Sequence, residues 1–233
     1  MTRSVHDGPE KTAALLRVSN AFALIFWGLL AWTLMWIGVV QVPMLARWGI
    51  PASAVSGALW AAAAWLVATT PPLTPRWPAA ARGFALMIGL HLYLLPYLGW
   101  WQWTAPAPYR HFNTALLVCA IAGGIFQLHR LANEIARALH DRVLFTEARL
   151  SFWSIPVIAI IFLGVFVWSA HRIGLDLGWR DWLDYFASQR PWSLRTTALL
   201  FLMPLLPPMA LAWEVRQRIH AWLPRGRCPE EEA

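Results

Sequence analysis

The sequence predicts an all-α protein, a polytopic transmembrane helix bundle of about six spans. Of the 233 residues, 58% are hydrophobic and 13% are charged, and the mean hydropathy is +0.48. A soluble domain carries about 25% charged residues. Several stretches also run past about 18 residues without a charge, which is long enough to cross a bilayer. These observations exclude a soluble enzyme domain and favour an integral membrane protein.

The first three spans are predicted at residues 21–42, 54–70 and 83–101. The first is longer than the apolar region of a cleavable signal peptide, about 7–15 residues, so we expect it to remain as an anchor. The second is rich in alanine and ends at Pro71-Pro72, which cannot continue a helix. The third ends among tryptophans, as helices often do at a membrane interface.

The remaining spans are predicted at residues 112–128, 152–170 and 197–213. Small residues at Gly123-Gly124 would let a neighbouring helix approach the fourth span closely. The sixth contains Pro204, Pro207 and Pro208, which should kink or break its helix. Such a break is either a packing kink or, as in some transporters, part of a transport site.

The charge distribution predicts that both termini lie in the cytoplasm. With six spans, thirteen basic residues fall on the inner side and six on the outer side, as the positive-inside rule requires. This rule also accounts for the net charge of +7 better than nucleic-acid binding does, because no run of five or six like charges occurs. We expect a cytoplasmic segment at 1–18, one membrane domain at 19–216 and a cytoplasmic tail at 217–233.

The spans contain few groups that could carry chemistry. No Asp, Glu, Lys or Arg lies within any of the six runs, which disfavours ion-coupled transporters, and His91 in the third run is the one histidine within them. It is interpreted either as a neutral histidine hydrogen-bonded to a neighbouring helix or as a ligand to haem or a pigment. The sequence contains seventeen tryptophans, and two of them, Trp32 and Trp36, share one helix face. The alternatives for the tryptophans within the spans are that they pack in the bundle, that they contact lipid, or that they line a cofactor site. No cofactor and no metal are predicted.

The fourth span should continue as an amphipathic cytoplasmic helix. Leu131, Ile135 and Leu139 share its apolar face, and Arg130–Glu134 and Arg137–Asp141 are spaced to form ion pairs. A second helix is then expected to start with Thr146 as its N-cap, with Phe145 packing on Leu150. We call this helix–turn–helix the elbow.

The loop between spans five and six should carry an interfacial helix on the outer leaflet. Its residues Trp179, Trp182 and Tyr185 alternate with charged side chains at helical spacing. No GxSxG, HExxH or Gly-rich phosphate loop occurs in the sequence, so we expect no catalytic residues.

The stretch FQLHRLANEIARALHDRVLFTEARL, Phe126 to Leu150, resembles an uncharacterised bacterial multi-pass membrane family, domain of unknown function 2975. The resemblance covers residues 112–222, and its strongest element is Phe145-Thr146-Glu147. This chain departs from the family in having two additional spans before that region and a long Trp-rich outer loop. Membership would imply a membrane protein without known enzymatic activity, acting with a small transcriptional regulator.

The leading hypothesis is a non-enzymatic inner-membrane sensor, regulator or accessory subunit. It would bind membrane lipids and another membrane or cytoplasmic protein, but no nucleic acid directly. The expected docking residues are Leu131, Ile135, Leu139 and Phe145 of the elbow and Trp179, Trp182 and Tyr185 of the outer loop. One alternative is a permease for a small uncharged or lipidic solute that uses His91 and Pro207. Another is a cofactor-holding subunit of a redox or light-harvesting complex, with His91, Trp32 and Trp36 at its site.

Overall fold

The computed structural model describes residues 8–41, 49–103, 108–153 and 205–223. Its helices are α1 (Pro9–Gln41), α2 (Gly49–Ala68), α3 (Trp77–Trp103), α4 (Pro108–Leu139) and α8 (Leu206–Trp222). Residues 142–153 form a further helical segment. No strand occurs within these ranges, so the all-α prediction is confirmed for them. The fifth predicted span beyond residue 153, and the sixth before residue 205, lie outside the described residues.

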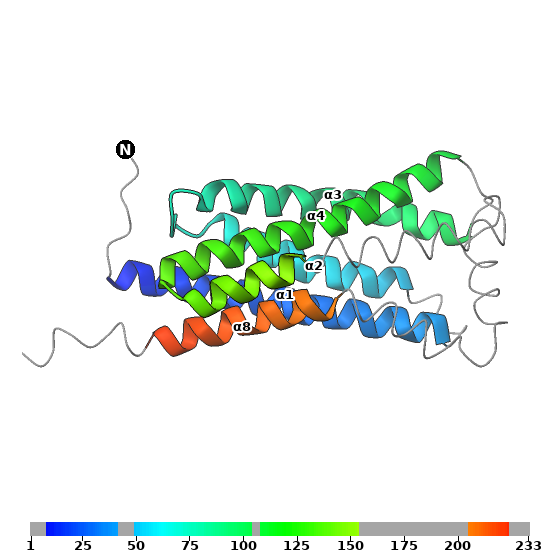
Figure 1. Ribbon diagram of the computed structural model, residues 1–233. Coiled ribbons are helices and arrows are strands. Elements are labelled where there is room, and N and C mark those ends of the chain that lie inside the picture. Colours follow the sequence, from blue (N-terminus) through cyan, green and yellow to red (C-terminus); the bar gives the residue numbers. More distant parts are fainter. Residues whose placement is uncertain (1–7, 42–48, 104–107, 154–204, 224–233) are drawn as a thin grey trace, which may run out of the picture.

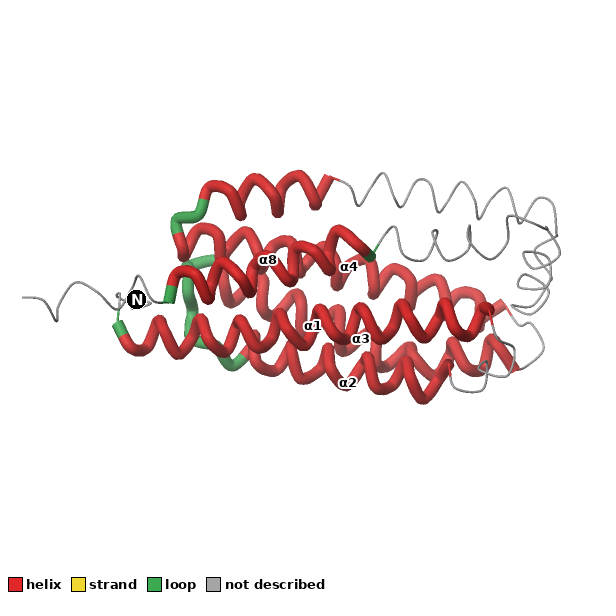
Figure 2. Tube along the Cα trace, turned by 90° about the horizontal axis from the view of Figure 1, so that it is seen from below, coloured by secondary structure: helices red, strands yellow, loops and turns green. Residues whose placement is uncertain are grey.

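Neighbouring helices run antiparallel, except α4 and α8, which run in the same direction, and the helices pack side by side in a closed ring (Figures 1 and 2). α1 packs against α2 and α8, α3 packs against α2 and α4, and α8 also packs against α4. Gly123 allows the close approach of α3 and α4, as predicted, because a Cβ there would lie 2.6 Å from Met87 Sδ. The ring brings together segments that are far apart in sequence, such as Ser19 of α1 and His220 of α8, which are 201 residues apart.

Two stretches are long and apolar enough to cross a membrane. They are Pro9–Met35 in α1 and Trp77–Pro96 in α3; Ser53–Ala68 in α2 is a shorter apolar helix. Large hydrophobic side chains also face outward along the ring, including Trp65 and Tyr93, each 70% exposed. Such an exterior is typical of a surface that contacts lipid or another protein. The number of spans stays a prediction.

The core lies inside the ring and extends to the end of the ring at which α1 begins and α8 ends. Leu15, Val18 and Phe22 of α1 are fully buried at helical spacing. Because these residues pack in the core, residues 9–18 belong to the helix bundle. Their cytoplasmic location stays a prediction. At the other terminus, α8 continues to Trp222 and buries Ile219, so part of the expected tail also belongs to the bundle.

The prolines of α8 lie where a helix tolerates them. Pro207 and Pro208 fall in its first turn, where backbone N–H groups have no acceptor within the helix. The described part of α8 therefore begins at Leu206, immediately before these prolines. The expected kink or break in a span at 197–213 stays a prediction, because the residues before 205 lie outside the described ranges. Pro204 lies outside the described residues.

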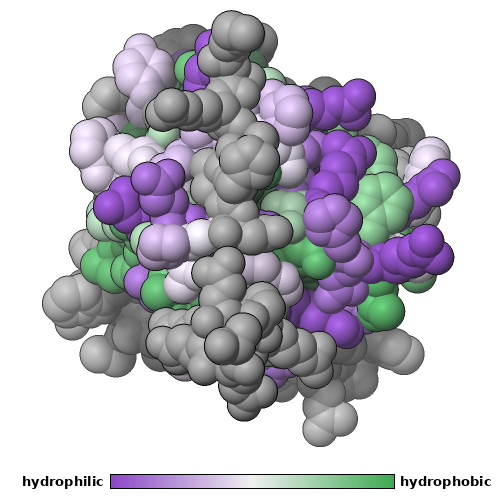
Figure 3. Space-filling model, turned by 90° about the vertical axis from the view of Figure 1, so that its left-hand side faces the viewer, coloured by the Kyte–Doolittle hydropathy of each residue, from purple (hydrophilic) through white to green (hydrophobic). Residues whose placement is uncertain are grey.

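Charged side chains gather at one end of the ring, at the left in Figure 1. This end combines the start of α1, the α2–α3 loop (69–76), the end of α4, the turn at 140–141 and the end of α8. We call it the charged end; its described basic residues are Lys11, Arg17, Arg76, Arg82, Arg130, Arg137, Arg142, Arg149, Arg216 and Arg218. Figure 3 shows hydrophilic side chains across this face. All ten are among the residues predicted to lie on the inner side.

Candidate functional site

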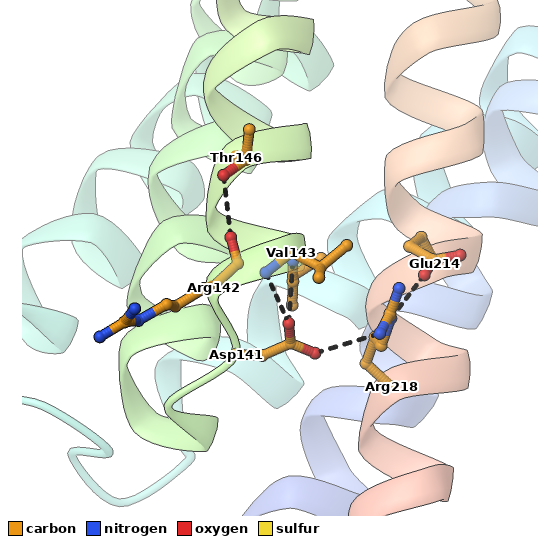
Figure 4. A network of polar contacts seen from close by, with 7 residues as sticks. Asp141, Arg142, Val143, Thr146, Glu214 and Arg218 are labelled. Carbon is orange, nitrogen blue, oxygen red and sulfur yellow. Dashed lines mark hydrogen bonds and ion pairs between the residues drawn. The ribbon is translucent and has the colours of Figure 1, made fainter.

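The elbow turns through two residues at the charged end. His140 has φ 55°, and Asp141 N–H and His140 N–H donate to the Ala136 and Arg137 carbonyls at 2.9 and 3.2 Å. This pattern ends α4 with a left-handed residue, a position usually taken by glycine. Asp141 Oδ1 then accepts the backbone N–H groups of Val143 (2.9 Å) and Leu144 (3.0 Å). Asp141 is thus the N-cap of the segment 142–153 (Figure 4).

The prediction of Thr146 as N-cap is therefore wrong. Thr146 lies inside the helical segment, and its hydroxyl donates to the Arg142 carbonyl at 2.9 Å. A threonine within a helix commonly makes this bond to the preceding turn. The N-cap of the helical segment lies five residues earlier than expected, at Asp141 instead of Thr146, and this changes which of its side chains face outward.

Asp141 also ties the elbow to α8. Its Oδ2 lies 3.5 Å from a guanidinium nitrogen of Arg218, and Arg218 Nε donates to Glu214 Oε1 at 2.6 Å (Figure 4). The hydrogen bond to Glu214 raises the pKa of Arg218, and the negative charge of Asp141 acts in the same direction, against desolvation. The elbow and α8 are thus joined by an ion pair.

The two predicted ion pairs within the elbow do not form. Arg137 binds Glu134, three residues before it, and not Asp141; Arg130 donates to Gln127 and not to Glu134. Glu134 is 6% exposed, and its second oxygen accepts the Thr74 hydroxyl at 2.6 Å. A buried charge requires partners, and the Glu134 carboxylate has two of them, Arg137 and Thr74. The bond to Thr74 joins the α2–α3 loop to α4.

A buried histidine joins α4 to the second half of the elbow. His129 Nδ1 donates to the Ile125 carbonyl at 2.8 Å, so in the neutral ring Nε2 accepts the Ser151 hydroxyl, also at 2.8 Å. Burial lowers the pKa of His129, and the bond to Ile125 partly opposes this shift. At the neighbouring edge, Ser19 of α1 and His220 of α8 share a hydrogen bond of 3.0 Å.

The expected docking face of the elbow lies inside the molecule. Leu131 and Ile135 are fully buried, Leu139 is 9% exposed, and Phe145 packs half-buried against the same core. The prediction that Leu131, Ile135 and Leu139 are open to a partner is therefore corrected: their apolar stripe packs into the ring. The elbow instead exposes a different set, namely Arg142, Val143, Arg149, Leu150 and Trp153.

His91 lies at the contact of α2 and α3. It is 1% exposed, and its ring packs edge-on against Trp60 with 5.0 Å between the ring centroids. Neither ring nitrogen of His91 has a hydrogen-bond partner among the described residues, and Trp60 Nε1 and Ser53 Oγ have none there either. The expected hydrogen bond from His91 to a neighbouring helix is thus not seen within these ranges.

A glycine on α1 makes room for the Trp60 ring. A Cβ at Gly28 would lie 2.4 Å from Trp60 Nε1, so the indole fills the place of a side chain on α1. The sequence did not single out Trp60 or Ser53. The available signal was their spacing of seven, which places both on one face of α2.

The other predicted site residues are not brought to this pair by any described contact. Trp32 is half-buried on α1 and packs against the core; Trp36 also belongs to α1, and Pro207 to α8. Trp179, Trp182 and Tyr185 lie outside the described residues. Within the ranges that the structure describes, no three His, Cys, Asp or Glu side chains form a group that could hold a metal ion.

Comparison with protein-family models, with curated proteins and with solved structures finds no match to this chain. The resemblance to domain of unknown function 2975 therefore stays a prediction. Any functional conclusion has to come from the site geometry itself.

Proposed function

We propose that the chain is a multi-pass protein of the bacterial inner membrane, with about six spans and both termini in the cytoplasm. It acts without enzymatic activity, as a sensor, regulator or accessory subunit that binds another protein. The charged end supports this orientation because basic residues favour the cytoplasmic side of a membrane. Ten basic and five acidic residues are described there, while the outward faces of the ring carry large hydrophobic side chains.

The observation that carries the proposal is the exposed face of the segment 142–153. Leu144 and Ala148 are fully buried, while Val143 is 51% and Leu150 68% exposed. Arg142 and Arg149 lie seven residues apart, on one exposed face of the segment. Protein interfaces are enriched in arginine beside apolar side chains, so the partner would offer an apolar patch with carboxylates around it.

The segment is also held in place, as a docking surface requires. Asp141 caps it and binds α8 through Arg218, and Ser151 bonds His129 of α4. These contacts use side chains that face inward, so they leave the arginines available. A surface fixed at both ends loses less conformational freedom when a partner binds.

The test is site-specific photocrosslinking in cells. With a photoreactive amino acid at position 149, we expect a crosslink to a cytoplasmic protein; with the same group at Trp65, on an outward face of α2, we expect none. Arg142→Glu should remove the crosslink at 149, while Arg142→Lys should retain it. Identical products at both positions, or lipid adducts alone at 149, would reject protein docking there.

The orientation has its own test. A fluorescent protein fused after residue 233 folds and fluoresces in the cytoplasm, whereas a periplasmic phosphatase fused there stays inactive. The opposite pair of signals would reject the cytoplasmic C-terminus.

The second candidate function is a permease for a small uncharged or lipidic solute. The polar groups of His91 and Trp60, buried at the contact of two apolar helices, favour it. In proteoliposomes, solute flux that depends on His91 would support this candidate. Equal flux with His91→Ala would reject a role for His91 in transport.

A further inference from the structure

The helical segment 142–153 divides its side chains between two opposite faces. Leu144 and Ala148 are fully buried, and Ser151 bonds His129 of α4, so these side chains face the bundle. The exposed side chains of the segment are Arg142, Val143, Thr146, Glu147, Arg149, Leu150 and Trp153. They all lie on the face that points away from the bundle core.

The exposed side chains follow a seven-residue repeat, the pattern of a helix that pairs with another helix. In the heptad notation abcdefg, the assignment is a for Val143 and Leu150, d for Thr146 and Trp153, e for Glu147, and g for Arg142 and Arg149. These four positions are the ones that the second helix of a coiled coil contacts. The large apolar members are Val143, Leu150 and Trp153, which are 51%, 68% and 61% exposed.

The polar side chains on this face are suited to contact with a second helix. The Thr146 hydroxyl donates to the Arg142 carbonyl at 2.9 Å, so its burial at a d position leaves no donor unbonded. The Arg142 side chain extends away from Asp141 and from α8 (Figure 4). Glu147 raises the pKa of Arg218 through its charge. Among the described residues, neither Arg142 nor Glu147 forms an ion pair.

A second copy of this chain is complementary to the face. Two copies in one membrane with the same orientation are related by a two-fold axis along the membrane normal, so their equivalent helices run in the same direction. In a parallel pair, the residue at g lies beside the e residue five positions further along the other helix. Arg142 and Glu147 are five residues apart, so the axis places each beside the other in the second copy. Val143 and Leu150 each meet their own counterparts.

We propose that two copies of the chain form a dimer through this face of the segment 142–153, as a short parallel coiled coil. An isolated helix of about 12 residues is marginal in water. Here the helix is already formed, because its other face packs in the bundle and Asp141 caps its start. The apolar side chains of the face then leave contact with water or lipid when the two copies meet.

The dimer goes beyond the proposed docking function and does not depend on it. Arg149, the second g residue, has no acidic residue five positions further along the sequence. It therefore gains no ion pair in the dimer and stays at the rim of the helix contact. There it remains within reach of a cytoplasmic protein.

Disulfide capture in isolated membranes tests the contact in the full-length protein. Leu150→Cys is made in a background with Cys119→Ser and Cys228→Ser, and a mild oxidant is added. A disulfide requires two Cα atoms within about 7 Å, as expected for an a position facing its counterpart. The control is Arg130→Cys, exposed on α4 and outside the contact. We expect a disulfide-linked dimer only for Leu150→Cys; equal rates at both positions would indicate random collision and overturn the proposal.

A charge swap gives the quantitative test. Energy transfer between labelled copies in proteoliposomes, at increasing protein-to-lipid ratios, measures dimerisation. Arg142→Glu and Glu147→Arg should each weaken dimerisation about tenfold, because each removes two ion pairs and sets like charges side by side. The double variant restores the pairing and should come within about threefold of the wild type.

Arg130→Glu is the control for the change in net charge and should leave dimerisation unchanged. A chain that stays monomeric at every protein density would overturn the proposal. So would a double variant that dimerises no better than the single variants, or an Arg130→Glu variant as weak as Arg142→Glu.

The two proposals fail separately. A crosslink from position 149 to a cytoplasmic protein, in a chain that stays monomeric, rejects the dimer but not the docking function. A dimer in which position 149 crosslinks only to the second copy rejects the docking function, while the dimer stands.

Discussion

Replacement of Asp141 tests how the elbow is held on the bundle. Asp141 makes two kinds of contact: its Oδ1 caps the segment 142–153 at Val143 and Leu144, and its Oδ2 pairs with Arg218 at 3.5 Å. Asp141→Ala removes both contacts. Asp141→Asn keeps an acceptor oxygen for the cap and removes only the charge.

The two contacts differ in magnitude. Loss of an N-cap costs about 0.5–2 kcal/mol, whereas a partly exposed ion pair contributes about 0–1 kcal/mol. The Arg218 side chain is 34% exposed and keeps its bond to Glu214, so the lower part of that range applies to the ion pair. We expect Asp141→Ala to lower the free energy of unfolding by about 2 kcal/mol and Asp141→Asn by less than about 1 kcal/mol.

The assay is reversible unfolding of the purified protein in mixed micelles, with Arg142→Gln as a surface control. Equal losses for Asp141→Asn and Asp141→Ala would refute this reasoning, because they would make the charge, and not the cap, the main contribution. An Asp141→Ala variant as stable as the wild type would refute the cap itself.

Three further predictions follow from burial and packing. Ile135→Asp should destabilise the fold by more than about 3 kcal/mol, since it buries an unpaired charge. Ile135→Leu should cost less than about 1.5 kcal/mol. Equal yields of folded, membrane-inserted protein for the two variants would contradict this prediction. Gly28→Ala should lower the free energy of unfolding by about 1–3 kcal/mol, because the new methyl group displaces the Trp60 ring. Gly123→Ala should lower it less, because its neighbour is a flexible methionine. Thermal unfolding of both variants tests this order. Because the pKa of His129 is lowered in the folded state, the unfolded state takes up a proton first, so stability should fall as the pH drops below about 6.5. A His129→Gln variant should lack this part of the pH dependence, and an unchanged pH profile would contradict the assignment.

The sequence predicted helices well and their ends less well. The apolar runs located α1 to α4 because each run is long enough to form a buried helix or a helix that crosses a membrane. The start of α1 was missed because residues 9–18 are amphipathic: Leu15 and Val18 pack inward while Leu16 and Arg17 are exposed. A criterion of uninterrupted apolarity cannot detect a helix turn with one buried face.

The elbow shows what depends on tertiary contacts. Asp141 and Thr146 are both good N-cap residues, and the staple between Phe145 and Leu150 favoured the later start. What distinguishes Asp141 in the structure is its ion pair with Arg218, a residue far away in sequence. In the same way, the sequence pattern of an apolar stripe such as that of Ile135 is the same whether the stripe faces a partner or the protein's own core.

The candidate site was predicted in part. His91 stood out because it was the one histidine within the apolar runs, but Trp60 was one of several tryptophans predicted to lie in the membrane. Its distinguishing feature is the glycine opposite, Gly28 on α1, which admits the indole ring. This pairing depends on the register between two helices, and a single sequence does not specify that register.

The bond between Thr74 and Glu134 joins the α2–α3 loop to α4. Thr74 lies in the loop that leads into α3, and Glu134 lies on α4, in the first helix of the elbow. Thr74→Val would leave one oxygen of a buried carboxylate without this donor, at a cost of about 1–3 kcal/mol, while Thr74→Ser should retain the bond and most of the stability. If Thr74→Val is as stable as Thr74→Ser in the unfolding assay, the contact does not hold the start of α3 on α4.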